Sequence, residues 1–187
     1  MDEFELVQGL RKGDETAFKY LVDNYQDRVF NTAMGIVQNA EDAEDVAQEV
    51  FIQVFRSISS FKGESKLSTW IYRIATTRAL DSLRSKKSKK RLGFLQRLFG
   101  EGNEPMHELP DFNHPGVQMD KKEDAAKLFK AIDQLPENQK TAFTLHKLED
   151  LSYAEISEVM QTSTSAVESL MHRARQNLKK ILEKGME

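Results

Sequence analysis

The chain has 187 residues, of which 39% are hydrophobic and 30% are charged, and its formal net charge is −3. This length allows one or two small domains with modest hydrophobic cores. The sequence contains no cysteine, which excludes a disulfide framework, a cysteine-ligated metal and thiol catalysis, and fits a reducing cytosol. No apolar run approaches the roughly 20 residues of a membrane span, and the acidic residues 1–5 do not resemble a secretory signal. We therefore expect a cytoplasmic protein without membrane insertion.

The charge is distributed unevenly along the chain. Residues 86–100 contain six Lys or Arg and no Asp or Glu, whereas the segments on both sides are net acidic. Neutralisation of phosphates dominates non-specific affinity for DNA, so an acidic chain with only local basic surfaces should bind free DNA poorly. Such a chain would need a larger partner to hold it on DNA.

The first 85 residues are predicted to form a helical domain. Asp14 can cap a long helix, a second helix begins near Ala40, and a third runs from about Leu67 to Arg84 after a loop at residues 59–66. Apolar residues recur at helical spacing in the first two helices. They are Ala17, Phe18, Leu21, Val22, Tyr25, Val29, Ala33 and Ile36, and then Ala43, Val46, Ala47, Val50, Phe51, Val54 and Phe55.

Residues 86–118 are predicted to be a flexible linker. A basic block at 86–91 is followed by frequent Gly and Pro residues up to Gly116. A short amphipathic helix on a membrane surface is conceivable here, but Gly93 weakens it and a tether is favoured. A second helical domain is expected at residues 119–187, with Pro136 at the first position of a helix. No segment alternates long enough to indicate a strand, so the predicted fold class is all-α, with two small helical domains joined by the linker.

Residues 151–182 have the layout of a helix-turn-helix. Ser152 is placed to cap a short helix, residues 161–163 form a polar turn, and a longer helix follows. One side of the longer helix is apolar, at Val167, Leu170, Met171, Ala174, Leu178, Ile181 and Leu182. Its other side offers hydrogen-bonding and basic groups, which is the division that a groove-binding helix requires.

Several motifs, in order along the chain, resemble those of the bacterial extracytoplasmic-function (ECF) sigma factors. They are Gly13-Asp-x-x-Ala-Phe18, AEDAEDVAQEVF at 40–51, FKGESKLSTWIYRIA at 61–75, Leu135-Pro136 and His172-Arg-Ala-Arg175. Each motif is weak by itself, but together they span both predicted domains and leave only the linker uncovered.

The resemblance implies a transcription initiation factor of the sigma-70 superfamily that has no catalytic residues, cofactor or metal. Residues 1–85 would be sigma region 2, which binds core RNA polymerase and opens the minus-ten promoter element. Residues 119–187 would be sigma region 4, which recognises the minus-thirty-five element. The implied partners are the beta-prime and beta subunits of the polymerase, promoter DNA, and an anti-sigma factor that is often membrane-bound.

The acidic side of the second helix is the candidate polymerase-binding surface, formed by Asp42, Asp45, Gln48, Glu49 and Ile52. Ile52 interrupts a polar face, as an interface anchor does. The acids have no nearby bases to pair with, so they could complement a basic partner. The resemblance implies a coiled coil of the beta-prime subunit. A solvated face is the simpler alternative, and a metal site is least favoured because no histidine accompanies the acids.

The loop and the third helix form the candidate minus-ten surface. A loop with an aromatic, a glycine and short polar groups can enclose a base removed from its stack, and an exposed Tyr72 can stack on single-stranded bases. Trp70 is expected at the core edge and Arg78 with a buried stem and a paired head; core packing is the alternative for Phe61. The family often has Asn where Thr77 stands, so its base preference is not transferred. The candidates are Phe61, Lys62, Gly63, Glu64, Ser65, Lys66, Tyr72, Arg73, Thr76 and Thr77.

The start and outer side of the last helix form the candidate minus-thirty-five surface. Hydroxyl groups at a helix N-terminus can bind a phosphate, Glu168 can accept from a cytosine amine, and the basic residues suit phosphates. For His172 a surface histidine without a special role is the alternative. The candidates are Ser163, Thr164, Ser165, Glu168, Ser169, His172, Arg173, Arg175 and Lys179.

Two other classes of function are alternatives to a sigma factor. A helix-turn-helix regulator that acts without polymerase should bind its operator unaided, and a receiver domain would need strands and a phosphorylatable Asp, which the sequence does not indicate. An enzyme would need a convergent nucleophile, base or metal set, and no spacing supports one.

Overall fold

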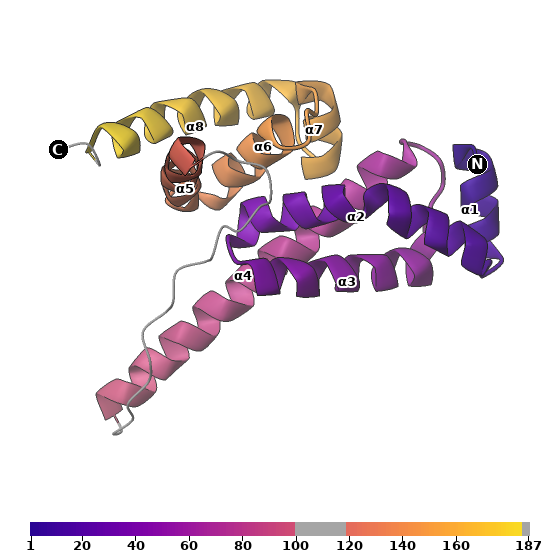
Figure 1. Ribbon diagram of the computed structural model, residues 1–187, viewed down its shortest axis with the longest axis horizontal. Coiled ribbons are helices and arrows are strands. Elements are labelled where there is room, and N and C mark those ends of the chain that lie inside the picture. Colours follow the sequence, from indigo (N-terminus) through magenta and orange to yellow (C-terminus); the bar gives the residue numbers. More distant parts are fainter. Residues whose placement is uncertain (100–118, 185–187) are drawn as a thin grey trace.

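The computed structural model describes the backbone of residues 1–99 and 119–184, and the side chains of residues 1–89 and 126–184. Every regular element in these ranges is helical, which confirms the all-α prediction (Figure 1). The elements are α1 (Glu3–Arg11), α2 (Glu15–Val37), α3 (Ala40–Ser57), the short 3₁₀ helix η1 (Ile58–Ser60), α4 (Leu67–Phe99), α5 (Met119–Asp133), α6 (Glu137–Lys147), α7 (Tyr153–Met160) and α8 (Thr164–Lys184).

The first three helices begin where side chains satisfy free backbone N–H groups. Asp2 and Glu5 form a reciprocal capping box at α1, in which each carboxylate accepts from the other residue's backbone N–H at 2.7 and 3.1 Å. Asp14 caps α2 as predicted, accepting a backbone N–H at 2.8 Å. Asn39 caps α3 in the same way at 2.9 Å, which places the start of α3 at Ala40 as expected.

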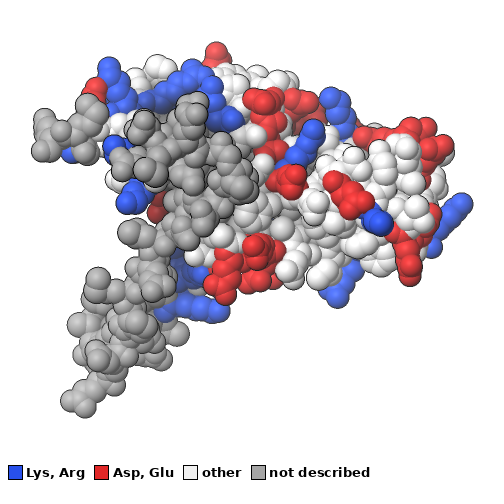
Figure 2. Space-filling model, viewed as in Figure 1, with Lys and Arg blue, Asp and Glu red and all other residues white. Residues whose placement is uncertain are grey.

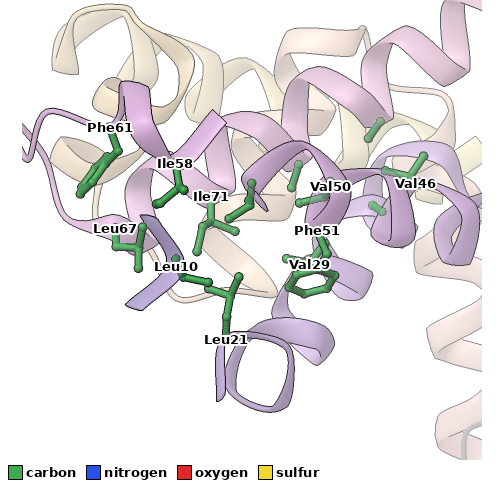
Figure 3. Close-up of a cluster of buried hydrophobic side chains, with 14 of the residues drawn as sticks. Leu10, Leu21, Val29, Val46, Val50, Phe51, Ile58, Phe61, Leu67 and Ile71 are labelled. Carbon is green, nitrogen blue, oxygen red and sulfur yellow. The ribbon is translucent and has the colours of Figure 1, made fainter. Parts of the chain in front are cut away.

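The first hydrophobic core lies among α1, α2, α3 and α4 (Figure 3). Leu21 of α2, Val50 of α3 and Leu67 of α4 are fully buried in it, and Leu10 joins from α1. Burial of one such side chain contributes about 1.5–3 kcal/mol to folding. With the exception of Phe55, the periodic apolar residues that were predicted to face inward therefore belong to or pack against one continuous core.

The second half of the chain is built around α8. Leu145 of α6, Ile156 of α7 and Met171 of α8 are fully buried together, and a smaller cluster with Leu178 joins α5 to the end of α8. The first helix of this half, α5, begins at Met119.

Three features of the helices differ from the sequence-based expectation. α4 was expected to end near Arg84 but continues to Phe99, so part of the expected linker is helical. The remainder of the linker, residues 100–118, lies outside the described residues. α1 was not predicted at all, and Pro136 is the N-cap of α6 rather than its first residue.

The two halves of the molecule pack against each other (Figure 1). α6 lies on α2 and α7 lies on α4. Gly35 permits the first contact, because a Cβ at this position would lie 2.3 Å from Cγ2 of Thr144 and 3.1 Å from Cδ1 of Leu148. A larger residue at position 35 would push α6 away from α2.

Candidate nucleic-acid and polymerase interfaces

The helix-turn-helix is built from local capping interactions. Ser152 and Glu155 form a capping box at α7, with the Ser152 backbone N–H donating to the Glu155 carboxylate at 3.0 Å. These bonds from Ser152 hold the pKa of Glu155 below its usual range. Gln161 ends α7 in a left-handed conformation (φ 53°), and the Ser163 hydroxyl accepts from the Ala166 backbone N–H at 3.2 Å as α8 begins. The predicted cap and turn are therefore confirmed.

The inner and outer sides of α8 separate as the sequence predicts, except that Leu182, predicted on the apolar side, is 37% exposed. Val167, Met171, Ala174 and Leu178 are buried. All nine candidate minus-thirty-five residues are exposed: Ser163, Thr164, Ser165, Glu168, Ser169, His172, Arg173, Arg175 and Lys179. In Figure 2 the Lys and Arg side chains form a band along α8 at the upper left.

Three of the four basic residues in this set are held by neighbours. Arg175 donates from Nη2 to the Tyr153 hydroxyl at 3.0 Å. The Nε2 atoms of His172 and Gln176 are hydrogen-bonded at 3.0 Å, and Lys179 Nζ lies 3.8 Å from Glu183 Oε1. Arg173, by contrast, has no partner among the described residues. A basic group that is exposed and unpaired in the free protein is well placed to bind a phosphate.

The outer side of α3 presents Asp45, Gln48 and Glu49 to solvent, with Ile52 49% exposed between them. The expectation that the acids lack basic partners is wrong for Asp42, because Lys86 of α4 forms an ion pair with it. Asp42 therefore helps to anchor α4 to α3.

Phe55 differs from its predicted place in the core, because it is 46% exposed. It follows Ile52 by three residues and so lies beside it on the helix. Its ring packs edge-on against Phe18 of α2, with 5.5 Å between ring centroids. The polar side of α3 thus contains a small apolar patch of Ile52 and Phe55, which the sequence showed only in part.

The loop between η1 and α4 borders an open pocket. Phe61 is only 6% exposed and packs on Trp70 with 5.3 Å between ring centroids, so the alternative of core packing holds for Phe61. Arg11 of α1 also donates to the Phe61 carbonyl oxygen, which ties the loop to the bundle. The pocket is lined by Ser60, Phe61, Lys62, Glu64, Ser65, Trp70, Arg73 and Glu158. Five of these eight residues come from the loop or lie next to it, Trp70 and Arg73 come from α4, and Glu158 comes from α7.

The side of α4 that was expected to face solvent is partly covered. Tyr72 is 5% exposed, Thr76 is also buried, and Tyr72 belongs to the α6–α8 core. The prediction of an exposed Tyr72 is therefore wrong for this structure, because the second half of the chain packs over it. Thr77 remains exposed and donates to the Arg73 carbonyl oxygen at 2.8 Å.

Residues of the candidate minus-ten surface contact the second half directly. The Tyr72 hydroxyl donates to Glu149 Oε2 at 2.8 Å, Arg73 Nη2 donates to the Glu158 carbonyl oxygen at 2.8 Å, and Lys66 Nζ lies 3.4 Å from Glu155 Oε1. Burial raises the pKa of Tyr72, and the Glu149 carboxylate adds to the rise.

Sequence reasoning missed these glutamates because each partner pair is far apart in the chain. Glu149 and Tyr72, for example, are separated by 77 positions. The only local signal is the concentration of carboxylates at Glu149, Asp150, Glu155 and Glu158. The expectation for Arg78 is confirmed: it is half-buried and donates to Gln53 Oε1 at 2.8 Å.

Two other kinds of site are not evident in the described part of the chain. Residues 1–89 and 126–184 contain no group of three His, Asp or Glu side chains that could hold a metal ion. None of the helices described is both long enough and apolar enough to span a bilayer.

The fold and surfaces define a class of protein: two helical domains, of which the second presents a helix-turn-helix with an exposed outer side. Residues 21–89 match the family model of Sigma-70 region 2, and residues 125–178 match that of Sigma-70, region 4. The chain belongs to the ECF group of the sigma-70 family, whose members are initiation factors that direct RNA polymerase to promoters.

Curated relatives cover nearly the whole chain. The chain is 36% identical over 179 residues to the RNA polymerase sigma-H factor of Pseudomonas aeruginosa, covering 96% of this chain and 93% of the relative. It is 37% identical over 171 residues to the ECF RNA polymerase sigma-E factor of Haemophilus influenzae, covering 91% and 90%.

Solved structures share the fold at lower identity. CnrH in complex with the cytosolic domain of CnrY superposes with a TM-score of 0.70 at 19% identity over 97% of both chains. The sigma factor RpoE of Bartonella quintana, in complex with the anti-sigma factor NepR, gives a TM-score of 0.63 at 20% identity over 89% of this chain and 96% of that one.

Proposed function

We propose that the two domains of this initiation factor divide promoter recognition between them. Residues 1–85 bind core RNA polymerase and the minus-ten element, and residues 119–187 bind the minus-thirty-five element. The observation that carries this proposal is the separation of α8 into a buried apolar side and an outer side on which all nine candidate residues are exposed. A helix of this kind fits the major groove, which admits an α-helix.

Within α8 the charges suggest two kinds of contact. Arg173, Arg175 and Lys179 bind phosphates and so position the helix without conveying sequence. Glu168 and Ser169 face outward between the helix start and these bases, where a carboxylate and a hydroxyl can contact base edges. Ser163 and Thr164 lie at the N-terminus of α8, whose free N–H groups favour a phosphate.

The polymerase-binding surface is proposed to be the outer side of α3. Asp45 and Glu49 supply negative charge that has no ion-pair partner among the described residues, and Ile52 supplies an exposed apolar anchor. Phe55 extends that anchor by one helical turn. Asp42 contributes less, because Lys86 already neutralises it.

The minus-ten strand is proposed to bind at the pocket between the loop of residues 61–66 and α4. Phe61 and Trp70 form its apolar wall, and Lys62 and Arg73 supply positive charge. Stacking of a base on an aromatic ring contributes about 1–3 kcal/mol. Tyr72 and Thr76 can take part only after the second half of the chain moves away.

The same proposal sets the partners and place of action. The factor acts by binding rather than by catalysis, alongside RNA polymerase in the bacterial cytoplasm. An anti-sigma factor is a further proposed partner, because RpoE of Bartonella quintana, which shares this fold, was solved with the anti-sigma factor NepR. Nothing in the described structure favours a regulator that acts without polymerase.

The test is transcription in vitro with core polymerase and a fragmented genomic library as template. We expect the full chain to produce RNA from a small set of start sites that share two sequence elements upstream. RNA synthesis that stays as unselective as with core enzyme alone would contradict the proposal. Tight, specific binding of the pure chain to promoter duplex without polymerase would instead support a regulator.

A further inference from the structure

The contact between the two halves lies on the proposed minus-ten surface. Of the ten candidate residues there, Lys66, Tyr72 and Arg73 each bond to the second half. Glu158 of α7 also lines the pocket proposed for a base. In this arrangement single-stranded DNA and the α7 region would compete for the same side chains.

Across this contact, the positive charges lie on the first half of the chain and the groups that accept from them lie on the second half. The first half supplies the cations. Lys66 and Arg73 contact α7 as described above, and Arg84 and Lys87 lie 3.4 and 3.1 Å from the Glu137 carboxylate of α6. The second half supplies the acceptors, which are the carboxylates of Glu137, Glu149 and Glu155 and the carbonyl oxygen of Glu158. A surface suited to phosphates is therefore neutralised by carboxylates of the same chain.

The hydrogen bond from Lys87 to Glu137, reinforced by Arg84, holds the pKa of Glu137 below its usual range. This carboxylate is thus charged when it binds the basic side of α4, as a phosphate is. Burial raises the pKa of Glu149, and the positive charge of Arg28 opposes this rise.

The close approach of α6 to α2 depends on one small residue, Gly35. The three atoms nearest to a Cβ at position 35 all belong to Thr144 and Leu148, so position 35 of α2 faces α6. Gly35 is therefore needed for the contact between the halves, and its substitution should leave the first core intact.

The described part of the contact contains buried polar groups without hydrogen-bond partners, which favour its opening. Among the described residues, Arg73 Nε, Thr76 Oγ1 and Thr144 Oγ1 are buried without a hydrogen-bond partner. Each such group costs free energy that solvent or a DNA strand would return. All three lie on elements that meet across the contact, α4 with α7 and α2 with α6.

We propose that the chain inhibits itself: Glu149, between α6 and α7, and Glu155 and Glu158 of α7 occupy the minus-ten surface as a substitute for the DNA strand, and the halves must separate before a promoter can be opened. This inference rests on the proposed function of that surface. It places the inhibition in the chain alone, with no second protein required. The outer side of α3 stays exposed, so the closed chain can still bind polymerase.

A reversible lock tests the proposal, because the natural chain has no cysteine. Gly35→Cys combined with Thr144→Cys places two thiols side by side: a Cβ at position 35 would lie 2.3 Å from Thr144 Cγ2 and 2.8 Å from its Oγ1, and Thr144→Cys replaces these two atoms by the one sulfur that bonds to the new side chain. After oxidation we expect full binding to core polymerase and at least a ~10-fold loss of promoter-specific RNA, restored by reductant. The cysteine-free chain, taken through the same oxidation and reduction, is the control.

The opposite variant, Gly35→Leu, should hold the halves apart. We expect a larger radius of gyration by solution scattering than for the natural chain, unchanged helicity, and half-maximal transcription at a roughly 10-fold lower concentration of factor, because more molecules are competent to bind. If Gly35→Leu does not fold, Glu149→Ala provides the same test.

The outcomes separate the two proposals. Equal radii for the natural chain and Gly35→Leu, or equal transcription by the oxidised and reduced lock, would overturn self-inhibition and leave the proposed function standing. If the reduced lock and the natural chain both fail to direct transcription with core polymerase, both proposals fail together.

Discussion

The outer side of α8 and the outer side of α4 carry similar groups, but only the first is open to solvent. All nine candidates on and before α8 are exposed, whereas Tyr72 and Thr76 of α4 are buried under the second half. The difference lies in the partner: the basic residues of α8 face outward, while Arg84 and Lys87 of α4 pair with Glu137 of α6 and Arg73 of α4 bonds to the Glu158 carbonyl oxygen of α7. Two surfaces proposed to bind DNA are thus in different states within one free molecule.

The amino-acid composition of a helix surface therefore does not show whether that surface is accessible to a partner. Both helices show apolar residues on one side and polar or basic residues on the other, and each pattern alone predicts a solvent-facing binding surface. Long-range contacts decide which one remains free. The α3 surface resembles that of α8 in this respect, because Asp45, Glu49 and Ile52 are exposed although the halves are docked.

The largest expected effect comes from reversing charge on the open α3 surface. Asp45→Arg with Glu49→Arg should weaken binding to core polymerase by more than ~100-fold, because like charges placed across an interface cost several kcal/mol. Pull-down and titration with core enzyme measure it, and thermal unfolding should be unchanged because both sites are exposed. Glu15→Arg with Asp23→Arg on α2 is the matched control, also on exposed positions. Undiminished binding would move the polymerase surface elsewhere.

A smaller effect is expected on the covered surface. Tyr72→Phe removes the hydrogen bond from the Tyr72 hydroxyl to Glu149 Oε2 and leaves a half-buried acceptor without this donor, at a cost of about 1–3 kcal/mol to the docked state. Solution scattering should show a larger fraction of open molecules. Tyr153→Phe is the matched control, since it removes a tyrosine hydroxyl that bonds only to Arg175 within the second half. Equal opening in both variants would show that Tyr72 does not hold the halves together.

Much of the fold could be predicted because its determinants are local. Asp14, Ser152 and the left-handed Gln161 act within four residues of their own positions, and all three lie where the sequence indicated a cap or a turn. The end of α4 was misplaced for a related reason. The basic block at 86–91 suggested a linker, but Lys and Arg favour helix and no Gly or Pro interrupts α4 before Gly93.

The covered surface could not be predicted from the sequence. Tyr72 and Glu149 meet only because α6 can approach α2 at Gly35, and a glycine within a helix carries no signal of its partner. Phe55 shows the same limit on a smaller scale. Its helical spacing fits the apolar stripe, yet its exposure depends on how far α2 extends beside α3, which no local pattern gives.

A modest effect is expected on the open side of α8. Arg173→Ala should weaken binding of the holoenzyme to minus-thirty-five DNA about fivefold, evenly across sequences, and lower the slope of log affinity against log salt by about 1. Lys19→Ala is the matched control, because it removes an exposed cation from the first half. Loss confined to one base position would instead identify Arg173 as a base contact. The size of the effect should be the same in Gly35→Leu, because docking leaves Arg173 exposed.

The smallest effect is a dependence of docking on pH through Glu149. Burial raises the pKa of this carboxyl above its usual 4.5, with Asp150 adding to the rise, while Tyr72, Arg28 and Asn31 oppose it. A raised pKa means that the docked state binds the proton more tightly than the open state. Its contribution to docking is therefore complete below pH 4.5 and is lost as pH rises through the docked-state pKa.

Scattering measured from that pH upward should show the open fraction of the natural chain increasing. Glu149→Gln should abolish this increase, because the neutral amide can still accept from Tyr72 but cannot ionise. Glu137 acts with the opposite sign, since Lys87 and Arg84 lower its pKa across the contact; this favours docking above pH 4.5 and withdraws that support as pH falls. The natural chain should consequently dock best at intermediate pH and open at both lower and higher pH. Glu149→Gln should lose only the opening at higher pH. If Glu149→Gln still opens at both lower and higher pH, a group other than this carboxyl governs the opening at higher pH.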